Sequence, residues 1–304
     1  MEHTRPQRTR VYQNHHIDSM RWVDFVPRSD DIIIATAYKC GTTWMQGIVS
    51  CLILGECRQR ASPWLDWRAT PLEKVMDLLT QQAHRRFIKT HLPLDGLPYF
   101  PQVRYIVVSR DPRDVFMSLW NHYSNYTAAA YAEVNDFPGR VGPPLPVCPV
   151  KLRDFWRVWI TCGWFEWESE GYPFWSNMRH VQTWWDFRYL PNILFVHYNH
   201  LKADPAGQIQ RLARYLGIPL AEDALPGLIE STSLDAMRQQ ALAGEADNKG
   251  PSIFKEGART FFYKGTNERW KEALTASDLA LYERAAGQEL TPECRAWLEE
   301  GRLR

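Results

Sequence analysis

Three absences in this 304-residue sequence exclude broad classes of protein. No apolar run reaches the ~20 residues that a bilayer-spanning helix needs, and MEHTRPQRTR is followed by no apolar segment of signal length. A formal net charge of +1 indicates no general attraction to nucleic acid or to an anionic membrane surface. The cysteines form no CxxC pair and no dense cluster, which favours a reducing cytoplasm. They are Cys40, Cys51, Cys57, Cys148, Cys162 and Cys294.

Two nucleotide-binding motifs are also absent. The sequence contains neither the Walker pattern GxxxxGK[ST] nor GxGxxG, which disfavours an ordinary kinase or a dinucleotide-binding protein. No group of histidine, cysteine and carboxylate residues has the spacing of metal ligands, so we expect no metal.

What the sequence does contain is an alternation of short β-branched runs and helical patterns. Such alternation predicts an α/β fold in which a mostly parallel sheet is flanked by helices and ligands bind beyond the carboxyl ends of the strands. At 45% hydrophobic residues, the whole of 1–304 can form one domain. The expected strands are 31–36, 86–90, 104–109 and 192–198, and the expected helices are 42–54, 71–83, 112–123 and 206–216.

Other segments fall outside this alternation. Residues 1–29 form an N-terminal extension, and the Pro/Gly-rich stretch 127–149 is typical of a mobile loop, which we expect near the acceptor site. Seven of the fourteen tryptophans lie between Trp156 and Trp185. They could pack a core or form an aromatic wall for an apolar ligand.

We call the segment in which the chain leaves a strand a strand exit. The first one, ATAYKCGTTW, combines the parts of an anion site. If the strand ends near Thr36 and a helix begins near Gly41, the amides of Gly41, Thr42 and Thr43 are the unpaired donors of a helix N-terminus. Together with the helix dipole and the cation of Lys39, they suit a phosphate. The alternative is an ordinary turn with a threonine cap.

The second exit is RYIVVSRDPRD. Asp111 can cap a helix that starts at Pro112, which places Arg110 at the strand tip and Ser118 about two turns into the helix. Both could reach a second anion. Alternatively, Arg110 pairs with Asp111 or Asp114.

The third exit, RFIKTHLPL, places Lys89 and His91 where sheets of this type hold reactive groups. A histidine can accept a proton near neutral pH, although a lone histidine is more often a hydrogen-bonded structural residue.

Five motifs together resemble the cytosolic-type sulfotransferases, which use 3′-phosphoadenosine 5′-phosphosulfate (PAPS) as donor and release PAP. They are DIIIATAYKCGTTW, FIKTHLPL, RYIVVSRDPRDVFMSLWNHY, ILFVHY and FFYKGTNERWK, and they span roughly residues 30 to 275. The resemblance implies a P-loop NTPase-like fold and the transfer of a sulfuryl group to an acceptor hydroxyl without a metal.

The resemblance also implies roles for individual residues. His91 is similar to the family's catalytic base, with Lys89 beside it, and Lys39 would stabilise charge on the departing nucleotide. Trp44 would stack on adenine, and Arg110 with Ser118 would hold the 3′-phosphate. The full set of implied nucleotide contacts is Lys39, Cys40, Gly41, Thr42, Thr43, Trp44, Arg110, Ser118, Tyr198, Thr232, Lys264 and Gly265.

The sequence departs from the family pattern at several positions. Cys40 stands where serine is usual, Leu234 replaces a phenylalanine against the adenine, and Tyr263 replaces an arginine before Lys264. Arg259, four residues upstream of Tyr263, could supply the missing cation. The short dimerisation segment of the animal enzymes is absent, so the sequence predicts no oligomeric state.

The aromatic composition favours a hydrophobic or aromatic small molecule or a glycolipid as the hydroxyl-bearing acceptor. Two other classes remain open: a P-loop-type nucleotide phosphotransferase and a non-catalytic nucleotide-binding module.

Overall fold

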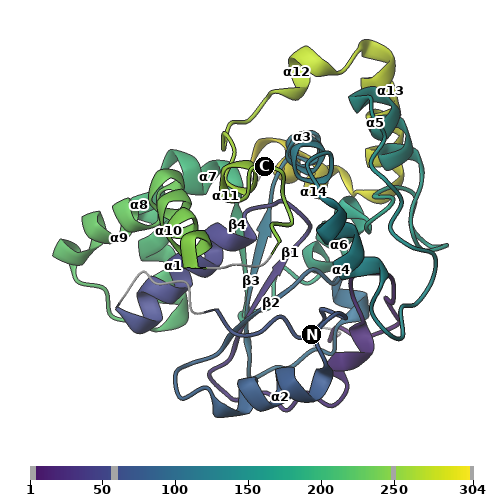
Figure 1. The fold of residues 1–304 in the computed structure, drawn as a ribbon. Helices are drawn as coiled ribbons and strands as arrows, with labels where there is room; N and C mark the ends of the chain where they lie inside the picture. Colours follow the sequence, from purple (N-terminus) through teal and green to yellow (C-terminus); the bar gives the residue numbers. More distant parts are fainter. Residues whose placement is uncertain (1–4, 56–60, 248–250, 302–304) are drawn as a thin grey trace.

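A four-stranded, wholly parallel sheet runs through the centre of the computed structural model, which describes residues 5–55, 61–247 and 251–301 (Figure 1). The strand order is β2-β1-β3-β4, and Ile34 of β1 pairs with Lys89 of β2 and with Ile106 of β3. The strands are β1 (Ile32–Thr36), β2 (Phe87–Thr90), β3 (Arg104–Ser109) and β4 (Ile193–His197). The predicted fold class and all four predicted strands are confirmed, with ends within one residue.

Helices occupy most of the connections. The predicted helices correspond to α1 (Thr42–Leu54), α2 (Leu72–Gln81), α3 (Pro112–Tyr123) and α8 (Pro205–Leu216). The others are η1 (Ser19–Trp22), η2 (Leu94–Gly96), α4 (Ala128–Asn135), α5 (Leu152–Thr161), α6 (Asn177–Trp185), α7 (Tyr198–Ala203), η3 (Glu222–Ala224), α9 (Leu225–Ser231), α10 (Leu234–Asp247), α11 (Ala258–Phe261), α12 (Trp270–Ala273), α13 (Ala276–Glu289) and α14 (Pro292–Glu300).

Both faces of the sheet are buried, which explains why its strands are continuous apolar runs. Ile32 and Ile34 face a core with α1, α8 and α9, whereas Ile33 and Ala35 face a larger core that includes α5, α6, α13 and α14. These two groups of helices lie on opposite sides of the sheet in Figure 1. Each fully buried isoleucine contributes about 1.5–3 kcal/mol of transfer free energy. The sequence thus forms a single α/β domain.

The N-terminal segment predicted as an extension contributes to this larger core. Tyr12, Ile17 and Trp22 are fully buried, and Tyr12 donates a hydrogen bond to Asp95 Oδ1 over 2.8 Å. Residues 12–22 therefore belong structurally to the domain.

The tryptophan-rich region is mainly core. Trp156, Trp159 and Trp184 are among the largest fully buried side chains, and Trp175 and Trp185 are buried as well. The core-packing interpretation accounts for these five.

The segment 127–149 begins as a helix, α4, and has no regular structure from residue 136 to its end. Tyr131 of α4 packs against Tyr126, which contacts His122. This places the start of the segment beside the cleft described below, while its predicted mobility stays a prediction.

The remaining features of the fold are the length and apolarity of its helices and the state of its cysteines. Within the described ranges, no helix has both the length and the apolarity needed to cross a bilayer. Cys51 is disulfide-bonded, Cys57 lies outside the described residues, and the free thiols are Cys40, Cys148, Cys162 and Cys294.

Candidate active site

A cleft of about 380 Å³ opens at the carboxyl end of the sheet, where β1 lies between β2 and β3. This is the position at which parallel α/β sheets hold ligands, because loops leave the strands there in diverging directions. Most of the predicted site residues line it: Lys39, Gly41, Thr42, Thr43, Trp44, Lys89, His91, Arg110, Ser118, Tyr198, Lys264 and Gly265.

The turn from β1 into α1 has the geometry of an anion site. Gly41 is the N-cap of α1 at φ +105°, with no side-chain cap, so the first amides of the helix are not used within it. The positive φ favours glycine at this position, and a Cβ at Gly41 would also lie in tight contact, 3.1 Å from the Tyr198 ring. The strand-helix turn therefore presents free amide donors to the cleft.

His91 is held by the end of strand β1. Its Nδ1 lies 2.8 Å from the carbonyl oxygen of Thr36 and 3.2 Å from Thr36 Oγ1, which also contacts Thr42 Oγ1 at 2.6 Å. Because a carbonyl can only accept, Nδ1 carries the proton and Nε2 is the basic atom of the ring. Burial, followed by the nearby cation of Lys89, lowers the pKa of His91 to about 3, so the ring is neutral at pH 7.

Two lysines enter the cleft beside this imidazole. Lys89 Nζ lies 4.2 Å from the centre of the Trp64 ring, and that ring is 5.1 Å from the ring of His91. Burial and the charges of Arg110 and Lys89 lower the pKa of Lys39 to about 7. Burial also lowers the pKa of Lys89, to about 8. Clustered cations with lowered pKa values indicate a site that an anion would neutralise.

Arg110 and Arg269 form a second cationic group. Arg110 donates to Thr266 O over 3.1 Å and to Asn267 Oδ1 over 2.6 Å, and its guanidinium stacks 4.2 Å from the Tyr198 ring. Burial, followed by the nearby positive charge of Arg110, lowers the pKa of Arg269. In the described parts of the chain, the Nε atoms of both arginines are buried without a hydrogen-bond partner. Two neighbouring guanidinium groups that line one cleft and have unused donors suit a phosphate.

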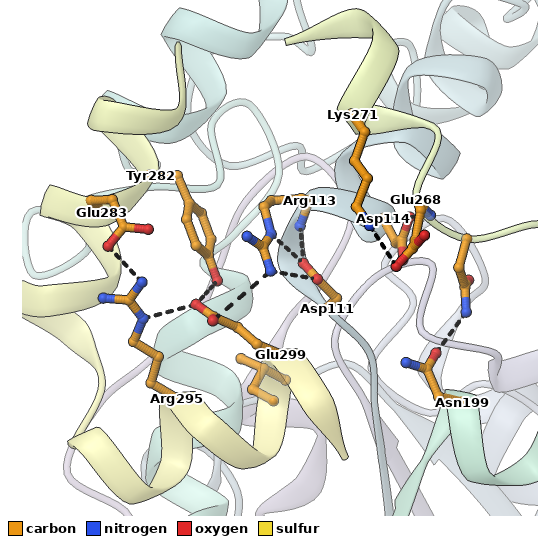
Figure 2. Close-up of polar contacts among 12 residues, drawn as sticks. Asp111, Arg113, Asp114, Asn199, Glu268, Lys271, Tyr282, Glu283, Arg295 and Glu299 are labelled. Carbon is orange, nitrogen blue, oxygen red and sulfur yellow. Dashed lines mark hydrogen bonds and ion pairs between the residues drawn. The ribbon is translucent and has the colours of Figure 1, made fainter. Parts of the chain in front are cut away.

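A polar network braces the helix that follows Arg110. Figure 2 shows Arg113 between Asp111 and Glu299, with contacts of 2.7 Å and 3.9 Å. Glu299 also accepts from Tyr282 and Arg295, so the C-terminal helices α13 and α14 support the start of α3. Asp111 caps α3 by accepting from the Arg113 amide, as the sequence predicts.

The loop 262–269, between α11 and α12 and called the late loop below, is joined to the same helix. The amide of Glu268, at φ +66°, donates to Asp114 Oδ1 over 2.6 Å, and Asn267 donates to Asn199 Oδ1 (Figure 2). Arg110 pairs with this loop rather than with Asp111 or Asp114, whose acceptor atoms are used by Arg113 and Glu268.

Three residues singled out from the sequence do not line the cleft. The thiol of Cys40 is buried and contacts Tyr38 O and Asn177. Thr232 is also buried, and its hydroxyl donates to Leu228 O over 2.8 Å. Arg259 is exposed on α11, so it is not placed to compensate for Tyr263.

Sequence reasoning missed several lining residues, because most of them lie within matching motifs to which no role was assigned, and Trp64, Lys202 and Met237 lie outside every motif. Leu234 and Tyr263, noted above as departures from the family pattern, do line the cleft. The missed residues are Tyr38, Trp64, Asn121, His122, Lys202, Met237, Phe261, Phe262, Thr266 and Arg269. The apolar surface of the cleft therefore comes from these residues more than from the tryptophan-rich region.

Comparison with known proteins identifies the family. The model of the sulfotransferase domain matches residues 29–291. The chain belongs to the sulfotransferase family. It is 35% identical over 312 residues to a glycolipid sulfotransferase of Mycobacterium bovis, covering 96% of this chain and 94% of the relative. It is 26% identical to sulfotransferase 1A1 of Canis lupus familiaris over 84% of this chain and 81% of the relative.

Solved structures show the same fold. A retinol dehydratase in complex with androsterone and the inactive cofactor PAP has a TM-score of 0.68 at 21% identity, covering 90% of this chain and 84% of that chain. A mouse sulfotransferase in complex with PAP has a TM-score of 0.66 at 18% identity over 91% of each chain. The sequence thus shows the sulfotransferase family, and these structures show the same fold.

Proposed function

We propose that the cleft binds PAPS and an acceptor alcohol together and transfers the sulfuryl group directly between them. One observation carries this proposal: His91, its basic Nε2 defined by the Thr36 carbonyl, lines the same cleft as Lys39 and the free amides of α1. A base, a cation and an anion-binding helix end are thereby available to one reacting group.

The donor fits the distribution of charge. The amides of Thr42 and Thr43 with Lys39 would hold the 5′-phosphosulfate, and Arg110 with Arg269 would hold the 3′-phosphate. Trp44, whose ring lies 5.6 Å from that of Tyr198, would stack on the adenine. Cations that follow two different strands, Lys39 after β1 and Arg110 after β3, match a nucleotide that carries phosphate at both its 5′ and 3′ positions.

The chemistry follows from these positions. As the acceptor oxygen bonds to sulfur, its proton passes to Nε2 of His91, and the bond from sulfur to the phosphate oxygen breaks. PAP leaves with that electron pair, and the Lys39 ammonium stabilises the charge on the departing oxygen. The anionic donor also neutralises Lys39 and Lys89, which raises the pKa of His91 and makes it a better base.

The acceptor is proposed to be a glycolipid or another hydrophobic alcohol or phenol. Tyr38, Trp64, Phe261 and Phe262 give the cleft an apolar wall, and the relatives that match along almost the whole chain are named glycolipid sulfotransferases. We also predict a cytoplasmic location, against which the disulfide bond at Cys51 counts, because disulfides are rare in reducing compartments. Fractionation of the native cells would test this prediction.

The proposal is tested by transfer from ³⁵S-labelled PAPS into a panel of glycolipids and phenols in excess chelator. Transfer should persist with chelator and should not occur from ATP. Phosphoryl transfer that depends on Mg²⁺ would instead support a nucleotide phosphotransferase. Binding of PAP without turnover of any acceptor would support a non-catalytic module.

A further inference from the structure

Helix α3 brings a second histidine, His122, into contact with Lys39. His122 lies one helical turn after Ser118 and is only 5% exposed. Its Nδ1 is 3.0 Å from Lys39 Nζ, and its Nε2 is 3.3 Å from the hydroxyl of Tyr38. The imidazole therefore bridges two side chains of the β1 exit.

The chemistry of the two partners sets the tautomer of this ring. A lysine ammonium can only donate, so Nδ1 of His122 accepts and Nε2 carries the proton, which it donates to the Tyr38 oxygen. Burial, Lys39, His16 and His91 all lower the pKa of His122, so the ring is neutral beside the lysine. His122 and His91 are thus both neutral, but the proton is on Nε2 in His122 and on Nδ1 in His91.

We propose that His122 is the positioning residue of Lys39: its Nδ1 holds the ammonium in the orientation that meets the departing phosphate oxygen of the donor. This inference rests on the proposed function and assigns a role to His122, a motif residue to which the sequence analysis gave none.

The surroundings of Lys39 explain why such an acceptor is needed. Its charged neighbours in the cleft, Arg110 and Lys89, repel the ammonium and favour its loss of a proton. The centre of the Phe261 ring lies 4.8 Å from Lys39 Nζ, which provides a weak cation–π contact without hydrogen-bond direction. The Nδ1 atom of His122 supplies that direction from a rigid helix.

The residue next to Lys39 does not take this part. The thiol of Cys40 contacts Tyr38 O at 3.7 Å and the Asn177 amide at 3.6 Å, so it is turned away from the cleft. Where the family's usual serine would place a hydroxyl, this chain has a buried sulfur. Among the described residues, the hydrogen bond to His122 Nδ1 is the polar contact that fixes the ammonium of Lys39.

The imidazole is itself well held. Its ring centre lies 4.7 Å from that of Phe254 and 5.2 Å from that of Tyr126. Phe254 forms an isolated bridge with Tyr126. Packing on these rings fixes the direction of Nδ1, which positioning requires.

Two substitutions separate positioning from packing. In His122→Asn the amide oxygen can occupy the place of Nδ1 and keep the bond from Lys39, whereas the longer side chain in His122→Gln reaches toward Tyr38 and loses that bond. We expect His122→Gln to lower kcat roughly 10- to 100-fold, the cost of a misplaced catalytic group, with a much smaller change in the donor KM. His122→Asn should keep kcat within about threefold of wild type, because its acceptor still directs the ammonium.

A second readout follows Lys39 without turnover. The pH at which acetic anhydride half-maximally labels Lys39, measured by peptide mass spectrometry, should fall in His122→Gln and stay unchanged in His122→Asn, because a neutral acceptor stabilises the ammonium. The positioning role would be overturned if His122→Gln and His122→Asn had equal kcat, whether or not Tm falls equally in both. It would also be overturned if the labelling pH of Lys39 were unchanged in His122→Gln. A wild-type protein that transfers no sulfate would overturn the proposed function, while the labelling experiment would still test the contact between His122 and Lys39.

Discussion

The ring of His91 is fixed by the backbone of Thr36, whose carbonyl oxygen accepts from Nδ1 over 2.8 Å. This single bond ties the exit of β2 to the end of β1 and decides which nitrogen can take a proton. A histidine that is neutral, oriented and open to a cationic cleft has the properties of a general base.

The pH dependence of the free enzyme follows from Lys39 and His91. With a pKa of about 3, His91 is already neutral at pH 5, so kcat/KM should show no acid limb from this residue above that pH. With a pKa of about 7, Lys39 loses its charge above neutrality, so kcat/KM for the donor should decline as pH rises through 7. The bound anion raises the pKa of Lys39, which should move the limb in kcat to higher pH.

Initial rates between pH 5 and 9 would measure the alkaline decline in each parameter, with low donor concentrations giving kcat/KM and saturating donor giving kcat. The control is Lys39→Arg, whose guanidinium does not titrate in this range and should move the decline from about pH 7 to about pH 8, where Lys89 loses its charge. An unaltered decline in that variant would assign the limb to another group.

The second cationic group predicts a difference between two arginines. Arg269→Ala should weaken PAP binding roughly 10- to 150-fold, as expected for loss of a charged hydrogen bond. Arg259→Ala removes an equal charge from the same region of the chain but outside the cleft, and should change affinity by less than about twofold. Calorimetric titration with PAP compares the two. A larger effect at Arg259 would show that the late loop binds the nucleotide differently.

Two buried glutamates predict a loss of stability at alkaline pH. Burial raises the pKa of Glu168 to about 8 and that of Glu170 to about 7, from an ordinary value of 4.5. Both are therefore protonated in the folded protein at pH values where the unfolded chain has lost those protons. Their contribution to the free energy of unfolding is complete below about pH 4.5 and is lost as pH rises through 7 and 8.

The double variant Glu168→Gln/Glu170→Gln mimics the protonated forms, because an amide has the shape of a neutral carboxyl group. Its Tm should fall less than that of wild type between pH 6.5 and 9. The buried histidines titrate equally in both proteins, so the difference isolates the glutamates. Parallel Tm curves would mean that these carboxyl groups ionise normally in the folded state.

The sheet could be predicted because its strands are short, apolar and buried on both faces, a pattern with few other solutions. The α1 and α3 starts could also be predicted, since Gly41, Asp111 and Pro112 act through local backbone chemistry. The location of Lys39, His91 and Arg110 in the cleft could be predicted because each residue follows the end of a strand.

Contacts made by distant segments could not be predicted in this way. Arg269 and His122 reach the cleft through the path of the late loop and the rotation of helix α3, which no local pattern specifies. Cys40 lies within a matching motif and Thr232 is a contact that the resemblance implies, yet the side chains of both are buried outside the cleft. The N-terminal residues 12–22 fill the larger core without any periodic signal.

Transfer of ³⁵S from labelled PAPS to a glycolipid acceptor, compared between wild type and His91→Ala, tests the central claim most directly. The account predicts a loss of roughly 100- to 10,000-fold in kcat with PAP affinity retained, because His91 moves a proton and does not hold the nucleotide. Sulfate transfer at the wild-type rate by His91→Ala, in a protein with unchanged Tm and PAP affinity, would contradict it.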